Sequence, residues 1–226
     1  MNTSKQNQDI RNYIDSNFAK EDDLLKEVRK GGSSAFQVPG QEIPPYVGKL
    51  LYFFVKLRNP KKILEIGTLC GYSTLWLAKG LSPSSYIISL EQQPLFVEKA
   101  KTNIDRAGLT DQVEVRLGKG VDSLSTMLKN QEGPFDLIFI DADKKSYAAY
   151  LEYAVSLAAP GALLLIDNLI PRESNVGSPN PENAQSCAVY EFNQILSTHP
   201  RLECVLIPTL AGEKGRIDAL GIAILN

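Results

Sequence analysis

Short apolar runs alternate with longer amphipathic segments over most of the chain. The segment from Pro94, which suits a first helical turn, to Gly108, which suits a helix C-cap, is typical of the longer kind. A second such segment runs from about Ser146 to Ala159 and stops at a Pro-Gly pair. The apolar runs predict strands at Lys62–Ile66, Tyr86–Glu91, Val113–Leu117, Phe135–Asp141, Ala162–Asp167, Leu202–Ile207 and Ala219–Leu225.

The composition of these runs indicates a sheet that is covered on both faces. Residues 135–140 are apolar except for Asp136, which is typical of a buried parallel strand. Alternating strands and helices then predict an α/β fold with right-handed crossovers and a doubly wound, mostly parallel, seven-stranded sheet. Only a turn-length link, residues 208–218, joins the last two runs. Because a helical crossover needs more residues, these two strands are predicted to form an antiparallel pair at one edge.

Residues 1–58 have a different character from residues 59–226. Helical patterns cover about Ser4–Phe18, Asp22–Lys30 and Tyr46–Arg58. A loop is predicted between the second and third, through Gly31–Ser34 and then from Val38–Gly40 to Pro44 and Pro45. We interpret residues 1–58 as a helical extension of the domain formed by residues 59–226. The extension could cover a binding site or mediate dimerisation, and both roles stay open at this point.

The overall composition excludes several classes of function. Of the 226 residues, 43% are hydrophobic and 22% charged, and the net charge of −2 leaves no basic footprint for nucleic acid. Three scattered cysteines match neither a disulfide framework nor a zinc site, and a single histidine gives little support to a Ser-His-Asp triad. No apolar run approaches the length of a membrane span, and no apolar signal core is present. We therefore predict a cytoplasmic protein without a membrane or nucleic-acid partner.

A glycine turn after the first strand carries the clearest ligand signal. Gly67 and Gly71 follow the strand and precede a helix, so backbone N–H groups can approach a ligand near the positive end of that helix. A dinucleotide fingerprint needs a further glycine where Leu69 stands, and no Gly-Lys-Ser/Thr motif is present. The turn therefore favours a nucleoside-like cofactor without a pyrophosphate. A purely structural role in packing is the alternative.

Acids or glycines follow each of the first five predicted strands, where ligands bind in open α/β sheets. Glu91 lies 20 residues after Gly71 (91 − 71), where a carboxylate suits two ribose hydroxyls. Asp141, Asp167 and Asn168 are hard oxygen donors, which suit Mg²⁺, Ca²⁺ or Mn²⁺ better than zinc or copper. Any single acid could instead be a helix cap.

Taken together, these motifs resemble a known family. Glu65–Thr68 with Gly71–Ser73, Glu91, Asp141–Lys144 and Asp167–Asn168 look like the motifs of cation-dependent O-methyltransferases that use S-adenosylmethionine, the caffeoyl-coenzyme A and catechol O-methyltransferase group. The resemblance covers about positions 35 to 225, in order and with compatible spacing.

The resemblance implies a set of roles for individual residues. Asp141, Asp167 and Asn168 would bind the metal, Mg²⁺ first of all, and Lys144 would act as general base beside Asp141. It also implies a small hydroxyl acceptor and a homodimer. The cofactor would be bound by Ile43, Glu65, Gly67, Thr68, Gly71, Tyr72, Ser73, Glu91, Gly118, Gly120, Asp141 and Asp143.

The chain departs from the family pattern mainly on the acceptor side. A polar loop, residues 169–179, replaces a stretch that contains tryptophan and is rich in glycine. Arg172 stands where the family has a substrate-contacting asparagine, and Val47 replaces an acid. The acceptor therefore need not be a caffeoyl thioester or a simple catechol, and Arg172 could meet an anionic one or merely be a surface residue. Two other functions stay open: methylation of a modified tRNA uridine, and a non-catalytic cofactor-binding module.

Overall fold

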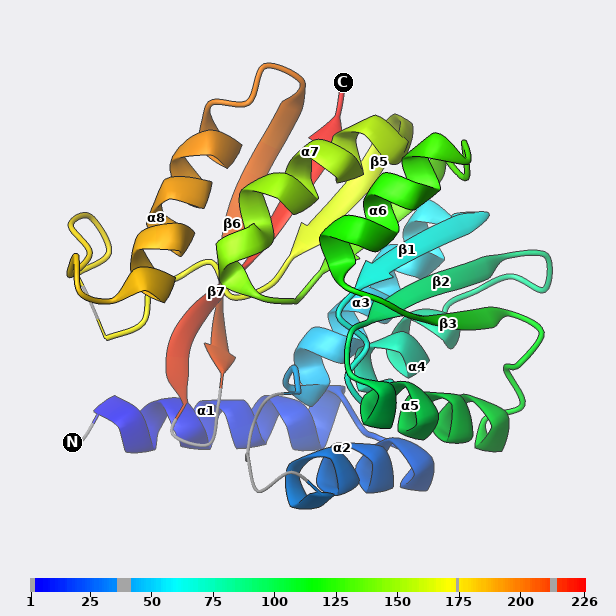
Figure 1. Cartoon of the computed structure of the whole chain (residues 1–226). Helices are drawn as coiled ribbons and strands as arrows, with labels where there is room; N and C mark the ends of the chain where they lie inside the picture. The colour runs from blue at the N-terminus through cyan, green and yellow to red at the C-terminus, as the bar shows by residue number, and fades with distance from the viewer. Residues whose placement is uncertain (1–2, 36–41, 174, 212–214) are drawn as a thin grey trace.

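A seven-stranded sheet forms the middle layer of the computed structural model in Figure 1, which describes residues 3–35, 42–173, 175–211 and 215–226. The strand order is β3-β2-β1-β4-β5-β7-β6. All pairings among β1 to β5 are parallel, whereas β7 is antiparallel to both β5 and β6. The doubly wound sheet with an antiparallel pair at one edge is thus confirmed. The strands are β1 (Lys62–Ile66), β2 (Tyr86–Glu91), β3 (Val113–Leu117), β4 (Phe135–Ile140), β5 (Ala158–Ile166), β6 (Leu202–Ala211) and β7 (Arg216–Leu225).

Helices cover both faces of this sheet because successive side chains of its central strands are apolar on either side. Leu64 and Ile66 pack among α6, α7 and α8, whereas Ile63, just before Leu64, points to the other face and packs among α3, α4 and α5. Both apolar sets are almost fully buried. The helices are α3 (Pro45–Arg58), α4 (Tyr72–Ala78), α5 (Pro94–Arg106), α6 (Gly120–Lys129), α7 (Tyr147–Leu157), with the short 3-10 turn η1 (Lys144–Ser146) before it, and α8 (Ala184–Ser197).

The N-terminal helices α1 (Thr3–Phe18) and α2 (Asp23–Ala35) both lie at the bottom of Figure 1. Leu25 and Val28 of α2 are buried in the apolar cluster of α3, α4 and α5. The hydroxyl of Tyr72, in α4, donates a hydrogen bond of 2.7 Å to Glu21. The extension therefore packs onto the core of the sheet, while the division at residue 58 stays a prediction.

Several predicted boundaries are wrong. Residues 31–34 belong to α2 and not to a loop, and the middle of that predicted loop, Val38–Gly40, lies outside the described residues. Pro45, at the end of the predicted loop, is the first residue of α3. Strand β5 begins at Ala158 because Ala158 pairs with Phe135 across a register shift. Strands β6 and β7 pair from Leu202↔Leu225 to Ala211↔Arg216, so most of the predicted link between them is strand.

Helix α8 was not predicted, although its signals are present in the sequence. The side chain of Asn183 caps its first turn by accepting a hydrogen bond of 3.0 Å from the Ser186 N–H. Val189, Phe192 and Leu196 then recur at helical spacing and are buried. Among the described residues, no helix is long and apolar enough to cross a membrane.

Candidate active site

A cavity of about 430 Å³ lies beyond the carboxyl ends of β1, β2, β4 and β5. Its wall brings together most of the residues that the sequence selected as site residues. Glu65 and Gly71 are the two exceptions among those selected residues. The selected residues in the wall are Ile43, Gly67, Thr68, Tyr72, Ser73, Glu91, Gly118, Gly120, Asp141, Asp143, Lys144, Asp167, Asn168 and Arg172.

The glycine turn brings β1 and β4 into close contact at the floor of the cavity. Gly67 has a φ of 103°, and a Cβ on it would lie 1.9 Å from the carbonyl oxygen of Asp141. Only glycine fits this position, because a side chain would meet backbone. Gly71, with a φ of 89°, forms the N-cap of α4 and lies behind the wall. Leu69 has a φ of 47°, so a non-glycine residue takes a left-handed conformation within the turn.

Glu65 lies beneath the cavity and not in its wall, so the predicted direct contact with a cofactor is not part of this geometry. Its fully buried carboxylate accepts hydrogen bonds from the hydroxyls of Ser73, Thr74 and Ser89. Burial raises the pKa of Glu65 to about 7, although the three hydroxyls oppose that rise. Because Ser73 does line the cavity, Glu65 acts on the site by holding Ser73.

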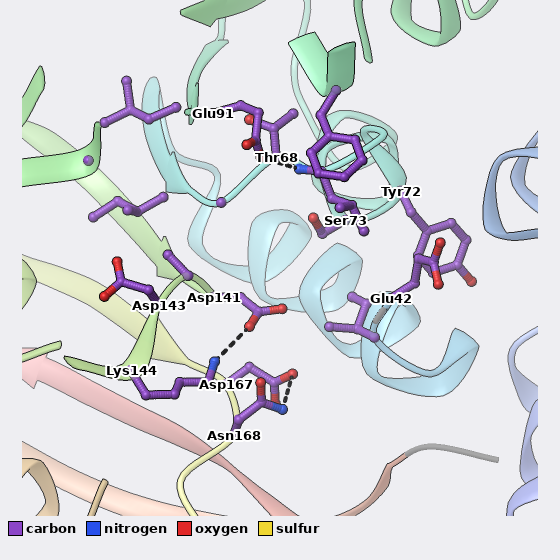
Figure 2. Close-up of a pocket in the computed structure, with 18 of the residues that line it drawn as sticks. Glu42, Thr68, Tyr72, Ser73, Glu91, Asp141, Asp143, Lys144, Asp167 and Asn168 are labelled. Carbon is purple, nitrogen blue, oxygen red and sulfur yellow. Dashed lines mark hydrogen bonds and ion pairs between the residues drawn. The ribbon is translucent and has the colours of Figure 1, made fainter. Parts of the chain in front are cut away.

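Glu91 defines one end of the cavity (Figure 2). Its Oε2 accepts a hydrogen bond of 2.9 Å from the Leu69 N–H, and its Oε1 accepts one of 2.9 Å from the Gln93 N–H. Each carboxylate oxygen has a second lone pair, so both can still accept a hydrogen bond from a ligand hydroxyl. The backbone thus holds the Glu91 carboxylate in a fixed position, and its contact with two ribose hydroxyls stays a prediction.

Lys144 meets Asp141 and Asp167 at the opposite end, as Figure 2 shows. Its Nζ lies 3.1 Å from Asp141 Oδ1 and 2.6 Å from the Tyr147 hydroxyl. The Tyr147 hydroxyl in turn donates a hydrogen bond of 2.9 Å to the carbonyl oxygen of Asp167. Sequence reasoning missed Tyr147, whose only signal is its place one turn after Lys144. Tyr147 positions the lysine on the strand end that carries the acids.

Asp167 and Asn168 complete this end of the cavity. Burial, with the nearby carboxylates of Asp141 and Asp218, raises the pKa of Asp167 to about 8. Asn168, with a φ of 63°, donates through Nδ2 to Asp167 Oδ2 and Asp218 Oδ2, at 3.2 Å each. Its amide oxygen is thereby left as a further acceptor.

The donor set at this end fits a hard divalent cation. Two carboxylates and one amide oxygen are the ligand types that Mg²⁺ and Ca²⁺ prefer, and a cation would offset the repulsion between Asp141 and Asp167. Among the described residues, no three His, Cys, Asp or Glu side chains group closely enough to hold a metal ion. The fit therefore depends on Asn168 as the third ligand.

Asp218 is a further residue that sequence reasoning missed. This fully buried side chain accepts hydrogen bonds at Oδ1 from the N–H groups of Ile170 (3.1 Å) and Ala219 (2.9 Å). Its Oδ2 lies 2.7 Å from Nη2 of Arg216, which also lines the cavity. The available signal was an acid within an apolar run, but residue 218 fell in the predicted link.

A family model described as O-methyltransferase matches residues 15–213. The chain belongs to this family. It is 36% identical over 217 residues to the catechol O-methyltransferase of Niastella koreensis, and the match covers 96% of each chain.

Solved structures agree with this assignment. An O-methyltransferase from Bacillus cereus in complex with SAH is 34% identical, with a TM-score of 0.86 and coverage of 99% of this chain and 100% of that one. The O-methyltransferase TomG from Streptomyces achromogenes, in complex with SAM, is 30% identical, with a TM-score of 0.89 and full coverage of both chains. The protein is therefore an S-adenosylmethionine-dependent O-methyltransferase, as the motifs implied.

Proposed function

We propose that this O-methyltransferase methylates one hydroxyl of a small catechol-type acceptor with the help of a divalent cation. The observation that carries the proposal is the cluster of Asp141, Lys144, Asp167 and Asn168 at one end of a single cavity, with Glu91 at the other end. The relatives named catechol O-methyltransferase support the choice of acceptor. A net charge of −2 does not favour tRNA as the acceptor, and the intact cluster does not favour a non-catalytic module.

S-adenosylmethionine supplies the methyl group, and the glycine-turn end of the cavity suits it. Glu91 would accept hydrogen bonds from the ribose hydroxyls, and Gly67 and Ser73 would face the methionine part. Binding at this end would leave the reactive part of the cofactor toward Asp141. Because methyl transfer is an in-line displacement, positioning of the acceptor oxygen is then the main task of the protein.

Asp141, Asp167 and Asn168 would hold the cation, with Mg²⁺ as the first choice and Ca²⁺ or Mn²⁺ as alternatives. A bound cation lowers the pKa of a coordinated hydroxyl and fixes its direction. Lys144 is the candidate general base, because its Nζ, held by Tyr147, lies beside the carboxylate of Asp141. In its uncharged amine form, the Nζ would take the proton that the hydroxyl loses and become an ammonium beside Asp141.

A methyl-transfer assay with a catechol panel, with and without EDTA, tests the proposal. We expect EDTA to abolish turnover, added Mg²⁺ to restore it, and Asp167→Ala to lower it by about a hundredfold or more, since a ligand is lost. Asp111→Ala, at an exposed turn residue, is the matched control. Turnover that survives both EDTA and Asp167→Ala would rule out the metal-assisted mechanism.

Gel filtration with light scattering tests the proposed homodimer, and cell fractionation tests the proposed cytoplasmic location.

A further inference from the structure

Arg216 is fixed in the wall of the cavity from strand β7. Its Nη2 lies 2.7 Å from Oδ2 of Asp218, which is fully buried and is itself held by two backbone N–H groups. An ion pair with an anchored, buried carboxylate holds one edge of the guanidinium in a set orientation. The other edge of that guanidinium is therefore presented in a fixed position as well.

The other edge of the Arg216 guanidinium carries a hydrogen-bond donor that lacks an acceptor. Nη1 of Arg216 is buried and has no hydrogen-bond partner among the described residues. A buried N–H donor without a partner costs about 1–3 kcal/mol, so such a group calls for an explanation. Since Arg216 lines the cavity, an oxygen atom of a bound ligand is the partner that the site can supply.

Arg172 brings a second guanidinium to the same end. Its backbone carbonyl accepts hydrogen bonds from the side chains of Asn183 and Ser186, so the loop is tied to the start of α8 at this point. Its side chain has no hydrogen bond or ion pair with any residue that the structure describes. It lines both the main cavity and a small adjoining cavity of about 50 Å³, which it shares with Lys144 and Asn168.

The balance of charge at this end favours a negatively charged acceptor. Lys144 pairs with Asp141 and Arg216 pairs with Asp218, while Arg172 has no acidic partner among the residues that the structure describes. Asp167 is the remaining carboxylate of the metal-ligand set at this end. A divalent cation on Asp141 and Asp167 would add further positive charge. Phenol oxygens alone would leave part of this charge unmatched, and a buried or partly buried cation is stabilised by a nearby anion.

We propose that Arg172 and Arg216 form a subsite for an oxyanion on the methyl acceptor, most simply a carboxylate attached to the catechol ring. The planar guanidinium group is the side chain best suited to carboxylate or phosphate oxygens. This inference rests on the proposed function, because it specifies which catechols the site selects. Arg216 is then a specificity-determining residue that sequence reasoning did not identify.

The test compares acceptors that differ only in this group: 3,4-dihydroxybenzoate, its neutral methyl ester, and 3,4-dihydroxyphenylphosphonate as the phosphate-type arm. We expect wild-type kcat/KM to be roughly 10- to 100-fold higher for the acid than for the ester, as a charged hydrogen-bonded pair would give. Arg216→Gln and Arg172→Gln should each reduce that ratio by about tenfold. Arg201→Gln, an exposed arginine at the far end of β6, is the matched control and should keep the wild-type ratio.

Other outcomes of this experiment separate the possible errors. An acid-to-ester ratio near one in the wild type, or a ratio unchanged in both arginine variants, would overturn the inference. A preference for the phosphonate over the acid would keep the subsite and assign it to phosphate. If Arg216→Gln does not fold, Arg216→Lys takes its place, because it retains the charge but not the planar fork. An acid-to-ester ratio that is lower in Arg216→Lys than in the wild type would support the inference.

Failure of the proposed function would look different from failure of this inference. If no catechol is methylated, calorimetric binding of the acid and the ester to the protein with SAH and Mg²⁺ still measures the subsite. Tighter binding of the acid that is lost in Arg172→Gln would support the subsite without the reaction. Equal binding of acid and ester would overturn it.

Discussion

The two ends of the cavity satisfy their polar groups in different ways. At the cofactor end, backbone N–H groups hold both oxygens of Glu91, and three hydroxyls hold Glu65. At the acceptor end, Asp141 and Asp167 repel each other, and Arg216 has a buried nitrogen with no hydrogen-bond partner in the described part of the chain. The first end is complete within the protein, whereas the second is completed by what binds there.

This difference matches the separate tasks of the two ends. The cofactor is constant, so a preformed site costs nothing in reorganisation when it binds. The acceptor end must change the ionisation of a hydroxyl, which requires charges that are close together and away from water. The unbalanced charge at the acceptor end is therefore what a reactive site requires, although it does not stabilise the fold.

Substitution of Lys144, the lysine of the acceptor end, should have the largest effect and tests whether the two ends have separate roles. We expect Lys144→Met to lower kcat roughly 10²- to 10⁴-fold, the range for loss of a general base. SAH affinity, measured by calorimetry, should change less than threefold, because Lys144 lies away from Glu91. Lys145→Met, at the exposed neighbouring lysine, is the control. An equal loss in both variants would contradict a role specific to Lys144.

At the cofactor end, Glu65 should make the free energy of unfolding depend on pH. The pKa of Glu65 rises from 4.5 to about 7 on folding, so the folded protein holds this proton more tightly than the unfolded chain. The resulting stabilisation is complete below pH 4.5 and is lost as the pH rises through 7, a change of about 3 kcal/mol in the free energy of unfolding.

Urea unfolding at pH 5, 6, 7 and 8 measures this effect as the difference between the wild type and Glu65→Gln. That difference cancels other titrating groups, such as Asp167. Glu65→Gln should therefore gain stability relative to the wild type as the pH rises. Glu98→Gln, at an exposed acid of α5, should follow the wild type. Parallel curves for wild type and Glu65→Gln would show that Glu65 does not titrate in this range.

The smallest expected effect comes from a crossed experiment on the two ends. Asp218→Asn should weaken Mn²⁺ binding, followed by electron paramagnetic resonance, about tenfold, since Asp218 orients Asn168. The same variant should bind SAH as the wild type does. Glu91→Gln should give the reverse, with weaker SAH binding and unchanged Mn²⁺ binding. If either variant weakens both ligands equally, the two ends are not independent.

Most of the fold follows from local pattern. Buried strands such as β4 and the glycine turn at Gly67 are encoded by contiguous residues, so the sheet and the cofactor end were predictable. The prediction was wrong where pairing with a distant strand decided the outcome, as at Ala158 in β5 and in the extension of β6 and β7. Propensity within a short window does not contain that information.

The predicted site residues divide in the same way. The carboxyl ends of parallel strands lie along one edge of a sheet. Three of the acids lie at or just after such strand ends, so their proximity could be anticipated: Glu91, Asp141 and Asp167. Asp218 and Arg216 could not be anticipated, because they lie on β7, which runs antiparallel to β5. Arg216 lines the cavity from this strand, and the buried Asp218 supports Arg216 and Asn168 from behind the wall. Glu65 was predicted to contact the cofactor, and only packing shows that it lies beneath the wall of the cavity and holds Ser73.

The sequence by itself determined the family, the order of strands and helices along the chain, and the chemical types of group at the strand ends. These depend on local spacing, which a chain carries in one dimension. The tertiary structure alone decided which polar groups are buried, which are paired, and which are left for a ligand. Those properties depend on residues far apart in the sequence, such as Asn168 and Asp218, which are 50 positions apart and hydrogen-bonded, and on the loss of water around them.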